Sequence, residues 1–311
     1  TQIKPLEGMM TPRFADIATF FRLPVIKDLS KLDYCICGVP WDGGTTNRPG
    51  ARHGPREIRN SSSLVRLYHP RSLKSPYDTF NVADIGDCPV NPADLQDSLL
   101  KIENFYNKIL QSKTIPISIG GDHLVSLPVL RALAKNKPVG LFQFDSHTDT
   151  YDTYFGGFKY THGTPFRRAI EENLIDPKKY VMLGIRGSLY HPDDLNWARE
   201  QGVTIITIDD FHEMGFNKVI DTIYKVLGDV STYLTFDIDG IDCTYAPGTG
   251  TPEVGGFTVR ESQTIIRALN KINFIGADVV EVSPPFDINN MTSHIGATIA
   301  FEILCTMTRT N

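Results

Sequence analysis

The sequence predicts an α/β fold, a three-layer α/β/α sandwich around a central parallel sheet. Apolar, β-rich runs alternate along the chain with stretches of helical periodicity, which is typical of a parallel sheet with helices on both faces. The runs are also almost continuously apolar, as strands buried on both faces are. No linker or internal repeat interrupts the 311 residues, so we expect a single domain over 1–311, with residues 1–33 as an N-terminal extension packed on it.

Seven runs along the chain are expected strands. They are "YCICGVP" (34–40), "TIPISIGG" (114–121), "VGLFQFDS" (139–146), "YVMLGIRG" (180–187), "VTIITIDD" (203–210), "TYLTFDID" (232–239) and "IGADVVEVSP" (275–284). Segments between them have the apolar spacing of helices, such as 123–136, 164–174 and 258–272. In a parallel sheet the chemistry lies beyond the carboxyl ends of the strands. Candidate functional residues are therefore expected where these runs end.

The composition argues against several classes of function. The net charge is −5, with 31 Lys+Arg against 36 Asp+Glu and no polybasic run, so we expect no nucleic-acid partner. The apolar stretches fall far short of the roughly 20 residues that span a bilayer, and the N-terminus lacks the continuous apolar segment of a signal peptide. Five scattered cysteines without CxxC spacing indicate reduced thiols. We expect a cytoplasmic protein with no membrane partner.

The run that begins at position 139 leads into an unusually charged segment, "DSHTD". Side chains alternate in direction along an extended strand. If the segment stays extended, Asp145, His147 and Asp149 point to one side, and Ser146 and Thr148 point to the other. A polar loop is the alternative reading of this short pattern on its own.

Two other runs end in residues of the same kinds. Asp237 and Asp239 share one face at the end of "TFDID", and His123 follows a Gly-Gly turn in "GGDH". Taken alone, "GGDH" could be only a turn and helix cap, with Asp122 as the N-cap. Together, however, three strand ends bring two imidazoles and four carboxylates to one edge of the predicted sheet.

Four buried carboxylates repel one another and would take up protons unless cations were near. Two divalent ions balance the four negative charges. Oxygen-rich ligands with one imidazole for each ion suit Mn²⁺, although Co²⁺, Ni²⁺ or Zn²⁺ would bind at least as tightly. The sequence therefore predicts a site for two divalent metal ions.

These segments resemble the ureohydrolase family of arginases, agmatinases and amidinohydrolases. The resemblance rests on blocks that follow one another along nearly the whole chain: 38–59, 118–130, 144–150, 161–166, 235–256 and 276–287. It implies a binuclear manganese site in an arginase-like fold. One ion would be held by His123, Asp145, Asp149 and Asp237. The other would be held by Asp145, His147, Asp237 and Asp239.

Two positions depart from the pattern of the family. Ser146 stands where alanine is usual, and Cys243 stands where the family usually has proline. Because the alternation along an extended segment directs Ser146 away from the metals, we expect it to change packing only. Cys243 is expected to be a free thiol in a loop.

The resemblance also implies a mechanism, in which a hydroxide that bridges two metal ions attacks a guanidinium carbon and yields urea and an amine. Glu281 would face the guanidinium group, which a carboxylate matches with paired hydrogen bonds. His162 would transfer a proton to the leaving amine or to solvent. Asp149 would relay a proton from the hydroxide to the leaving nitrogen.

For the substrate we favour a small guanidino acid, guanidinobutyrate or guanidinopropionate. The segment 151–161 is expected to line the mouth of the site, with Tyr151, Tyr154 and Phe155 against the substrate. A carboxylate tail would need a cation, for which the candidates are Lys159, Arg48 and Arg186. The alternatives are agmatine, or free guanidine, a substituted guanidine or a biguanide with nickel.

Two other classes of protein compete with this interpretation. A zinc deacylase of related fold is disfavoured by the complete ligands for two ions and by Glu281. A non-catalytic subunit of a mixed oligomer would be expected to lack ligands, and none is missing here. By resemblance we expect a homo-oligomer, a trimer or hexamer, with a small guanidino compound as its substrate.

Overall fold

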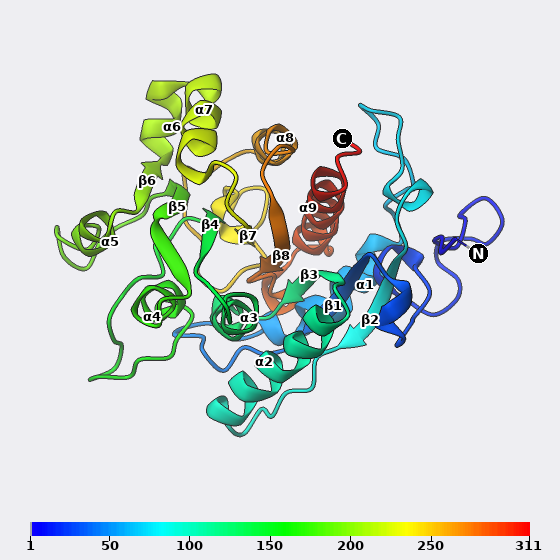
Figure 1. Cartoon of the computed structure of the whole chain (residues 1–311), viewed down its shortest axis with the longest axis horizontal. Coiled ribbons are helices and arrows are strands. Elements are labelled where there is room, and N and C mark those ends of the chain that lie inside the picture. Colours follow the sequence, from blue (N-terminus) through cyan, green and yellow to red (C-terminus); the bar gives the residue numbers. More distant parts are fainter. Residues whose placement is uncertain (1) are drawn as a thin grey trace.

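The computed structural model describes residues 2–311 and contains one eight-stranded sheet whose paired strands are all parallel (Figure 1). The strands are β1 (Tyr34–Val39), β2 (Val82–Asp87), β3 (Ile115–Gly120), β4 (Val139–Phe144), β5 (Ile175–Ile185), β6 (Thr204–Thr207), β7 (Thr232–Asp237) and β8 (Phe274–Val280). Their order across the sheet is β2-β1-β3-β8-β7-β4-β5-β6. The strands β3, β7 and β4, which precede the predicted ligands, thus lie near its middle.

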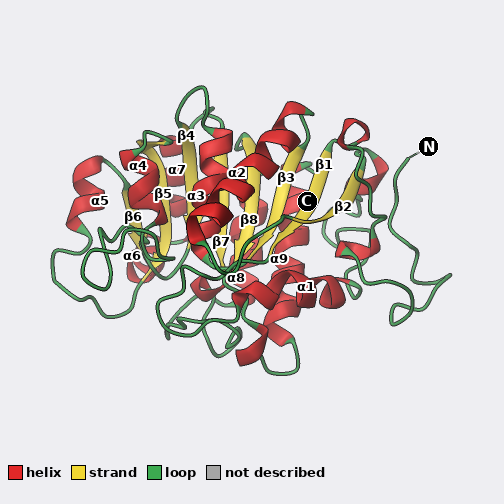
Figure 2. Ribbon diagram, turned by 90° about the horizontal axis from the view of Figure 1, so that it is seen from below, coloured by secondary structure: helices red, strands yellow, loops and turns green. Residues whose placement is uncertain are grey.

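Helices cover both faces of this sheet, which confirms the predicted α/β/α sandwich (Figure 2). One layer consists of α2 (Leu95–Gln111), α3 (Ser126–Leu133), α4 (Pro165–Glu171) and α5 (Asn196–Gln201). The other consists of α1 (Gly54–Ser62), α6 (Ile208–Met214), α7 (Phe216–Leu227), α8 (Val259–Ala268) and α9 (Met291–Met307). None of the described helices is long and apolar enough to cross a membrane.

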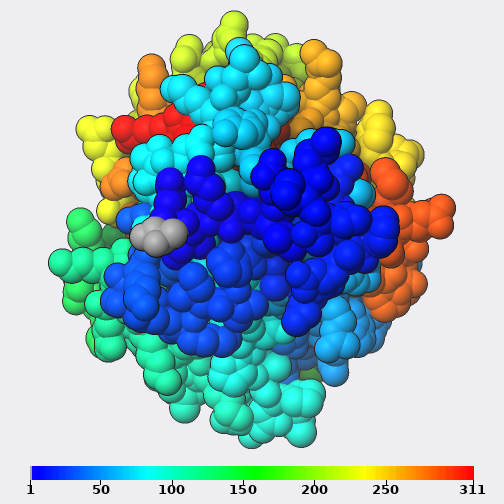
Figure 3. Space-filling view, turned by 90° about the vertical axis from the view of Figure 1, so that its right-hand side faces the viewer, coloured from blue at the N-terminus to red at the C-terminus, as the bar shows by residue number. Residues whose placement is uncertain are grey.

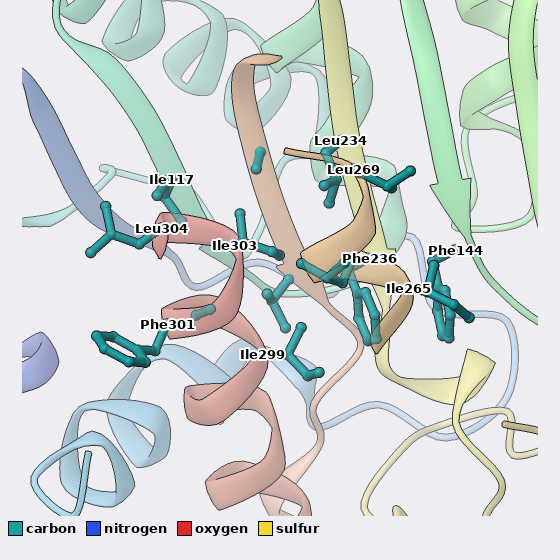
Figure 4. Packing of buried hydrophobic residues seen from close by; sticks show 14 of the residues in the cluster. Ile117, Phe144, Leu234, Phe236, Ile265, Leu269, Ile299, Phe301, Ile303 and Leu304 are labelled. Carbon is teal, nitrogen blue, oxygen red and sulfur yellow. The ribbon is translucent and has the colours of Figure 1, made fainter. Parts of the chain in front are cut away.

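Each face of the sheet has its own hydrophobic core, because successive side chains of a strand point to opposite faces. Phe144 and Phe236 stack with ring centroids 4.3 Å apart on the face covered by α8 and α9 (Figure 4). Leu141 and Tyr233, on the same two strands, pack into the core on the other face. Burial of both faces explains why these runs read as continuously apolar.

The structure corrects two details of the predicted elements. The run 203–210 is not one strand, because β6 ends at Thr207 and α6 begins at Ile208. Thr207 and Asp210 form a capping box that starts this helix, and such a box ends strand pairing. Strand β2 was missing from the prediction because Asp84 interrupts its apolar run; this buried carboxylate is paired with Arg59 at 2.9 Å.

The N-terminal segment lies across the surface beside residues from the first half of the chain (Figure 3). The backbone N–H of Phe20 donates to Asp84 (3.0 Å) and that of Phe21 donates to Ser62 (2.8 Å), and both phenyl rings are buried. Other apolar side chains of this segment, Met9, Met10 and Phe14 among them, remain largely exposed.

Gly121 joins β3 to the first metal-ligand candidate, and no side chain fits there. A Cβ atom at this position would lie 1.6 Å from the carbonyl oxygen of Trp41, and Asp122 N–H donates to that same oxygen at 2.8 Å. We predict that Gly121→Ala lowers the free energy of unfolding by about 3 kcal/mol or more, because backbone must move to admit the methyl group.

Gly156→Ala is the matched control for this prediction. Gly156, unlike Gly121, has a positive φ, +76°, but a Cβ there meets nothing within 4 Å, so only backbone strain of about 1–2 kcal/mol is expected. Both variants are measured by chemical denaturation. Equal losses in the two variants would contradict the proposed clash.

Candidate metal centre

The segment that follows β4 leaves the strand in a turn, so the extended backbone that the alternation argument assumed is not formed. β4 ends at Phe144, and the backbone N–H of His147 donates back to Oδ1 of Asp145 at 2.7 Å. Asp149 has φ +52°. The turn nevertheless places Asp149 and His147 in two adjoining groups of potential ligands that share Asp145.

His123 is oriented by a chain of buried hydrogen bonds. Its Nε2 lies 2.7 Å from the hydroxyl of Thr235, and that hydroxyl donates to Oδ1 of Asp278 at 2.6 Å. Because the Thr235 proton goes to the carboxylate, Thr235 accepts the proton of Nε2. Nδ1 of His123 is therefore the nitrogen with a free lone pair, as in metal sites where an outer partner sets the tautomer of the ligating histidine.

The end of β7 supplies two further carboxylates. Asp237 is the last residue of the strand, and its Oδ1 accepts the backbone N–H of Asp239 at 2.8 Å. Both carboxylates are buried, with exposed fractions of 2% and 1%. Their second oxygens remain available to a ligand.

The residues fit a metal ion in their chemistry and in their spacing. Three oxygens surround Nδ1 of His123: Oδ2 of Asp149 at 2.9 Å, and Oδ2 of Asp145 and of Asp237, each at 3.1 Å. None of these contacts has hydrogen-bond geometry, so this buried nitrogen is without a hydrogen-bond partner within residues 2–311. Spacings of about 3 Å are those of atoms that bind one ion at about 2.1 Å.

A second group of potential ligands adjoins the first. It consists of Asp145, His147 and Asp239, so Asp145 belongs to both groups. Nδ1 of His147 lies 3.1 Å from Oδ2 of Asp239. Asp237, which the resemblance assigned to both ions, falls in the first group alone by this spacing. The two groups together contain all six predicted ligands.

The electrostatics of the cluster favour bound cations. Burial, with repulsion from Asp149 and Asp239, raises the pKa of Asp145 to about 7. The pKa of Asp237 is raised well above its ordinary value by burial and by the charges of Asp239 and Asp145. Without positive charge, such raised pKa values favour the protonated carboxyl groups. Divalent ions remove that penalty.

The expectation for Ser146 was wrong. Its side chain does not point away from the cluster: the hydroxyl donates to Oδ1 of Asp239 at 2.7 Å and lies 3.1 Å from Nδ1 of His147. The physical reason is the turn after Phe144, which abolishes the alternation that an extended segment would have. Cys243 has no disulfide partner and is partly exposed in a loop.

His162 and Glu281 form a buried pair beside the cluster. Nδ1 of His162 lies 2.8 Å from Oε1 of Glu281, and the same oxygen accepts the backbone N–H of His123 at 2.8 Å. Burial alone would lower the pKa of His162, but the Glu281 carboxylate outweighs this effect and raises it to about 9. Glu281 has φ +66° just beyond β8, which turns its carboxylate toward His123.

A cavity of about 530 Å³ opens onto these groups. His147, Asp149, Asp237, His162 and Glu281 all line it. The cavity thus gives a small molecule access to both candidate metal groups and to the His162–Glu281 pair.

Some of the predicted substrate-binding residues line this cavity and others do not. Tyr151 and Tyr154 line it, whereas Phe155 is 74% exposed and is not among the lining residues. Among the three candidate cations, Arg48 lines the cavity, and Lys159 and Arg186 do not. Arg186 instead donates to backbone carbonyl groups of the neighbouring loops, among them that of Asp239 at 2.7 Å.

Thr46, Tyr190 and Glu253 are among the cavity residues that sequence reasoning missed. Thr46 and Glu253 lie inside blocks that resemble the family, so the signal was present without an assigned role. Tyr190 lies outside these blocks. It reaches the cavity because the carboxylate of Asp194 accepts both the Tyr151 hydroxyl and the Tyr190 backbone N–H, each at 2.9 Å.

We predict that the His162–Glu281 contact stabilises the metal-free protein by about 3 kcal/mol below pH 6.5 and by little above pH 9. The pKa of His162 rises from an ordinary 6.5 to about 9 on folding, so the folded state binds this proton more tightly. That stabilisation is lost as the pH rises through about 9. The measurement is the free energy of unfolding of wild type and His162→Gln at pH 6.5 and pH 9.5.

The difference between wild type and His162→Gln should shrink by about 3 kcal/mol between the two pH values. His191→Gln is the control, because the side chain of His191 is 67% exposed and an exposed ion pair contributes little. A difference that is the same at both pH values would show that the charged pair does not form.

Comparison with known proteins agrees with this geometry. A model of the Arginase family matches residues 32–306. The chain is 54% identical over 302 residues to the guanidinopropionase of Pseudomonas aeruginosa, covering 97% of this chain and 95% of the relative. It is 41% identical over 304 residues to the mitochondrial agmatinase of Gallus gallus, covering 97% and 89%. The solved structure of proclavaminate amidino hydrolase from Streptomyces clavuligerus matches with a TM-score of 0.92 and 38% identity, covering 97% and 100%. The chain therefore belongs to the arginase family of binuclear-metal hydrolases.

Proposed function

We propose that this protein hydrolyses a small guanidino acid, guanidinopropionate or guanidinobutyrate, to urea and an amino acid. The observation that carries the proposal is the His/Asp cluster at one end of a cavity that also contains the His162–Glu281 pair. Relatives named guanidinopropionase (54% identical) and guanidinobutyrase (43% identical) support the choice of substrate.

Two divalent ions would be held by the two groups of ligands, and Mn²⁺ is our first choice. When bound, such ions lower the pKa of a shared water so that hydroxide is available near neutral pH. The ligand set that we propose is the one the sequence predicted: His123, Asp145, His147, Asp149, Asp237 and Asp239.

Glu281 would bind the guanidinium group of the substrate. Its Oε1 already accepts two hydrogen bonds, from His123 N–H and His162 Nδ1–H. Oε2 accepts none from the described residues and belongs to a side chain that lines the cavity. A planar guanidinium can donate to this oxygen, which holds the substrate in a defined orientation.

His162 would give a proton to the leaving amine. Two contacts favour opposite protonation states of its ring. The Glu281 carboxylate beside Nδ1 favours the charged form. The backbone N–H of Thr46, 3.1 Å from Nε2, donates to that nitrogen and favours the neutral form. The Thr46 hydroxyl, 2.8 Å from Nε2, can serve either form. This balance suits a group that both gives and takes a proton. Asp149, which also lines the cavity, would carry the proton from the attacking water.

Arg48 would bind the carboxylate tail of a guanidino acid. Among the described residues that line the cavity, it is the one Lys or Arg. Its guanidinium group donates to the carbonyl oxygens of Thr249 (2.6 Å) and Gly250 (2.9 Å) and lies 4.2 Å above the ring of Phe286. These contacts use two of the donors and hold the group at the rim.

A cationic tail, as in agmatine, is the second candidate. The carboxylate of Glu253 lines the same cavity, with Oε1 3.7 Å from Nε2 of His147. A single carboxylate at the rim would attract an ammonium group there. Arg48 and Glu253 therefore favour opposite tails.

We also propose that the protein forms a homo-oligomer, a trimer or hexamer. Four apolar side chains of the N-terminal segment are between 80% and 94% exposed: Met9, Met10, Phe14 and Ile17. Exposed apolar groups that gather on one segment are typical of interaction surfaces. Burial of these side chains against another subunit would remove them from water.

We predict that complete removal of metal abolishes urea release from guanidinopropionate, and that Mn²⁺ restores it. The reason is that hydroxide is scarce near neutral pH without a metal that lowers the pKa of water. Metal content is measured by mass spectrometry, and Ni²⁺, Co²⁺ and Zn²⁺ are tested in parallel. Full turnover by a metal-free preparation would overturn the mechanism.

We further predict that Arg48→Met lowers kcat/KM for guanidinopropionate by 10- to 100-fold, the effect of about 1.5–3 kcal/mol from one charged hydrogen bond. Propylguanidine has the same carbon chain length and no carboxylate. The kcat/KM of Arg48→Met for propylguanidine should therefore stay within threefold of wild type. Lys159→Met is the control for loss of a cation outside the cavity. If both substrates lose activity equally, Arg48 acts only by holding the loop at Thr249 and Gly250.

A further inference from the structure

Ser146 lies between two residues of the second metal group and is fully buried. Its Oγ is 2.7 Å from Oδ1 of Asp239 and 3.1 Å from Nδ1 of His147. A hydroxyl has one proton to donate. A carboxylate is the stronger acceptor, so this proton goes to Asp239.

The same serine contributes a second hydrogen bond to the same oxygen. The backbone N–H of Ser146 donates to Oδ1 of Asp239 at 3.2 Å. Oδ1 is thus occupied twice by one residue. Oδ2 of Asp239 has a weak contact with the hydroxyl of Thr251 at 3.5 Å and lies 3.1 Å from Nδ1 of His147. Oδ2 is therefore the oxygen that Asp239 can offer to a cation.

The other carboxylates of the cluster are held in a different way. Oδ1 of Asp145 accepts the backbone N–H of His147, and its Oδ2 accepts the side-chain amide of Gln143. Oδ1 of Asp237 accepts a backbone N–H. Among these described residues, Asp239 is the carboxylate whose noncoordinating oxygen receives a side-chain hydroxyl. The contacts of Ser146 with potential ligands therefore fall on the second group.

We infer that Ser146 is a positioning residue for the second metal ion. Its hydroxyl would hold Oδ1 of Asp239 and leave Oδ2 for the ion, and its Oγ lies between the Asp239 carboxylate and the His147 ring. Removal of the hydroxyl leaves the longer backbone N–H contact of 3.2 Å as the one hydrogen bond from Ser146 to Asp239, so the carboxylate turns more easily. The inference rests on the proposed ligand set.

The test is a titration of metal-free full-length protein with Mn²⁺, in which unbound Mn²⁺ is measured by its electron paramagnetic resonance signal. Wild type should bind two ions in two affinity classes. In Ser146→Ala, we expect the dissociation constant of one class to rise 10- to 100-fold, as is usual when an outer partner of a ligand is lost. The other class should stay within threefold of wild type.

Ser283→Ala is the matched control. Ser283 is also a fully buried serine, but within residues 2–311 its hydroxyl has no hydrogen-bond partner. This variant should bind both ions as wild type does. If Ser146→Ala also keeps both dissociation constants within threefold, or weakens both classes equally, the positioning role is overturned.

Asp239→Ala separates this inference from the proposed ligand set. If Asp239→Ala loses one ion and Ser146→Ala binds one ion more weakly, the results support both the ligand set and the positioning role of Ser146. Loss of one ion in Asp239→Ala with unchanged binding in Ser146→Ala overturns the inference about Ser146 alone. If Asp239→Ala still binds two ions with the affinities of wild type, the ligand set itself is wrong.

Discussion

Electrostatic repulsion within one buried cluster is the constraint on which the rest of the structure depends. Four aspartates from the ends of β4 and β7 lie around His123 and His147 with almost no contact with water. Such a group of like charges is stable only when cations compensate for it. The sheet supplies the rigid frame that brings these carboxylates together, since β7 pairs directly with β4. A core on each face of the sheet holds that frame in place.

Around the cluster, a second set of hydrogen bonds fixes how each ligand presents its atoms. Asp278 and Thr235 set the tautomer of His123. Backbone N–H groups in the turns after the strands occupy one oxygen of Asp145 and one of Asp237. Oδ2 of Asp145 also accepts the side-chain amide of Gln143, whereas Oδ2 of Asp237 accepts no hydrogen bond from the described residues and lies beside Nδ1 of His123. Preorganisation of this kind raises metal affinity, because little rotational freedom is lost when an ion binds.

The cavity rim is built differently from the cluster. Its residues come from loops far apart in the sequence, around Arg48, Tyr154, Tyr190 and Glu253. Loops tolerate change without loss of the sheet. Members of one family can therefore keep the metal chemistry and differ in the tail of the guanidino compound that they accept. Arg48 and Glu253 both lie at this rim. The charge that lies nearer the bound tail selects between an acidic and a basic guanidino compound.

The sequence alone determined the fold class, the family and the six candidate ligands. It could do so because strands buried on both faces read as continuous apolar runs, and because the ligands lie within a few residues of the strand ends. Tertiary structure alone decided the direction of Ser146, the pairing of His162 with Glu281 and the contribution of Tyr190 to the cavity. Alternation predicts side-chain direction only while the backbone is extended, and the turn after Phe144 ends that regularity. Contacts such as that of Tyr190 join segments 39 residues apart, and they depend on how loops pack rather than on any local pattern.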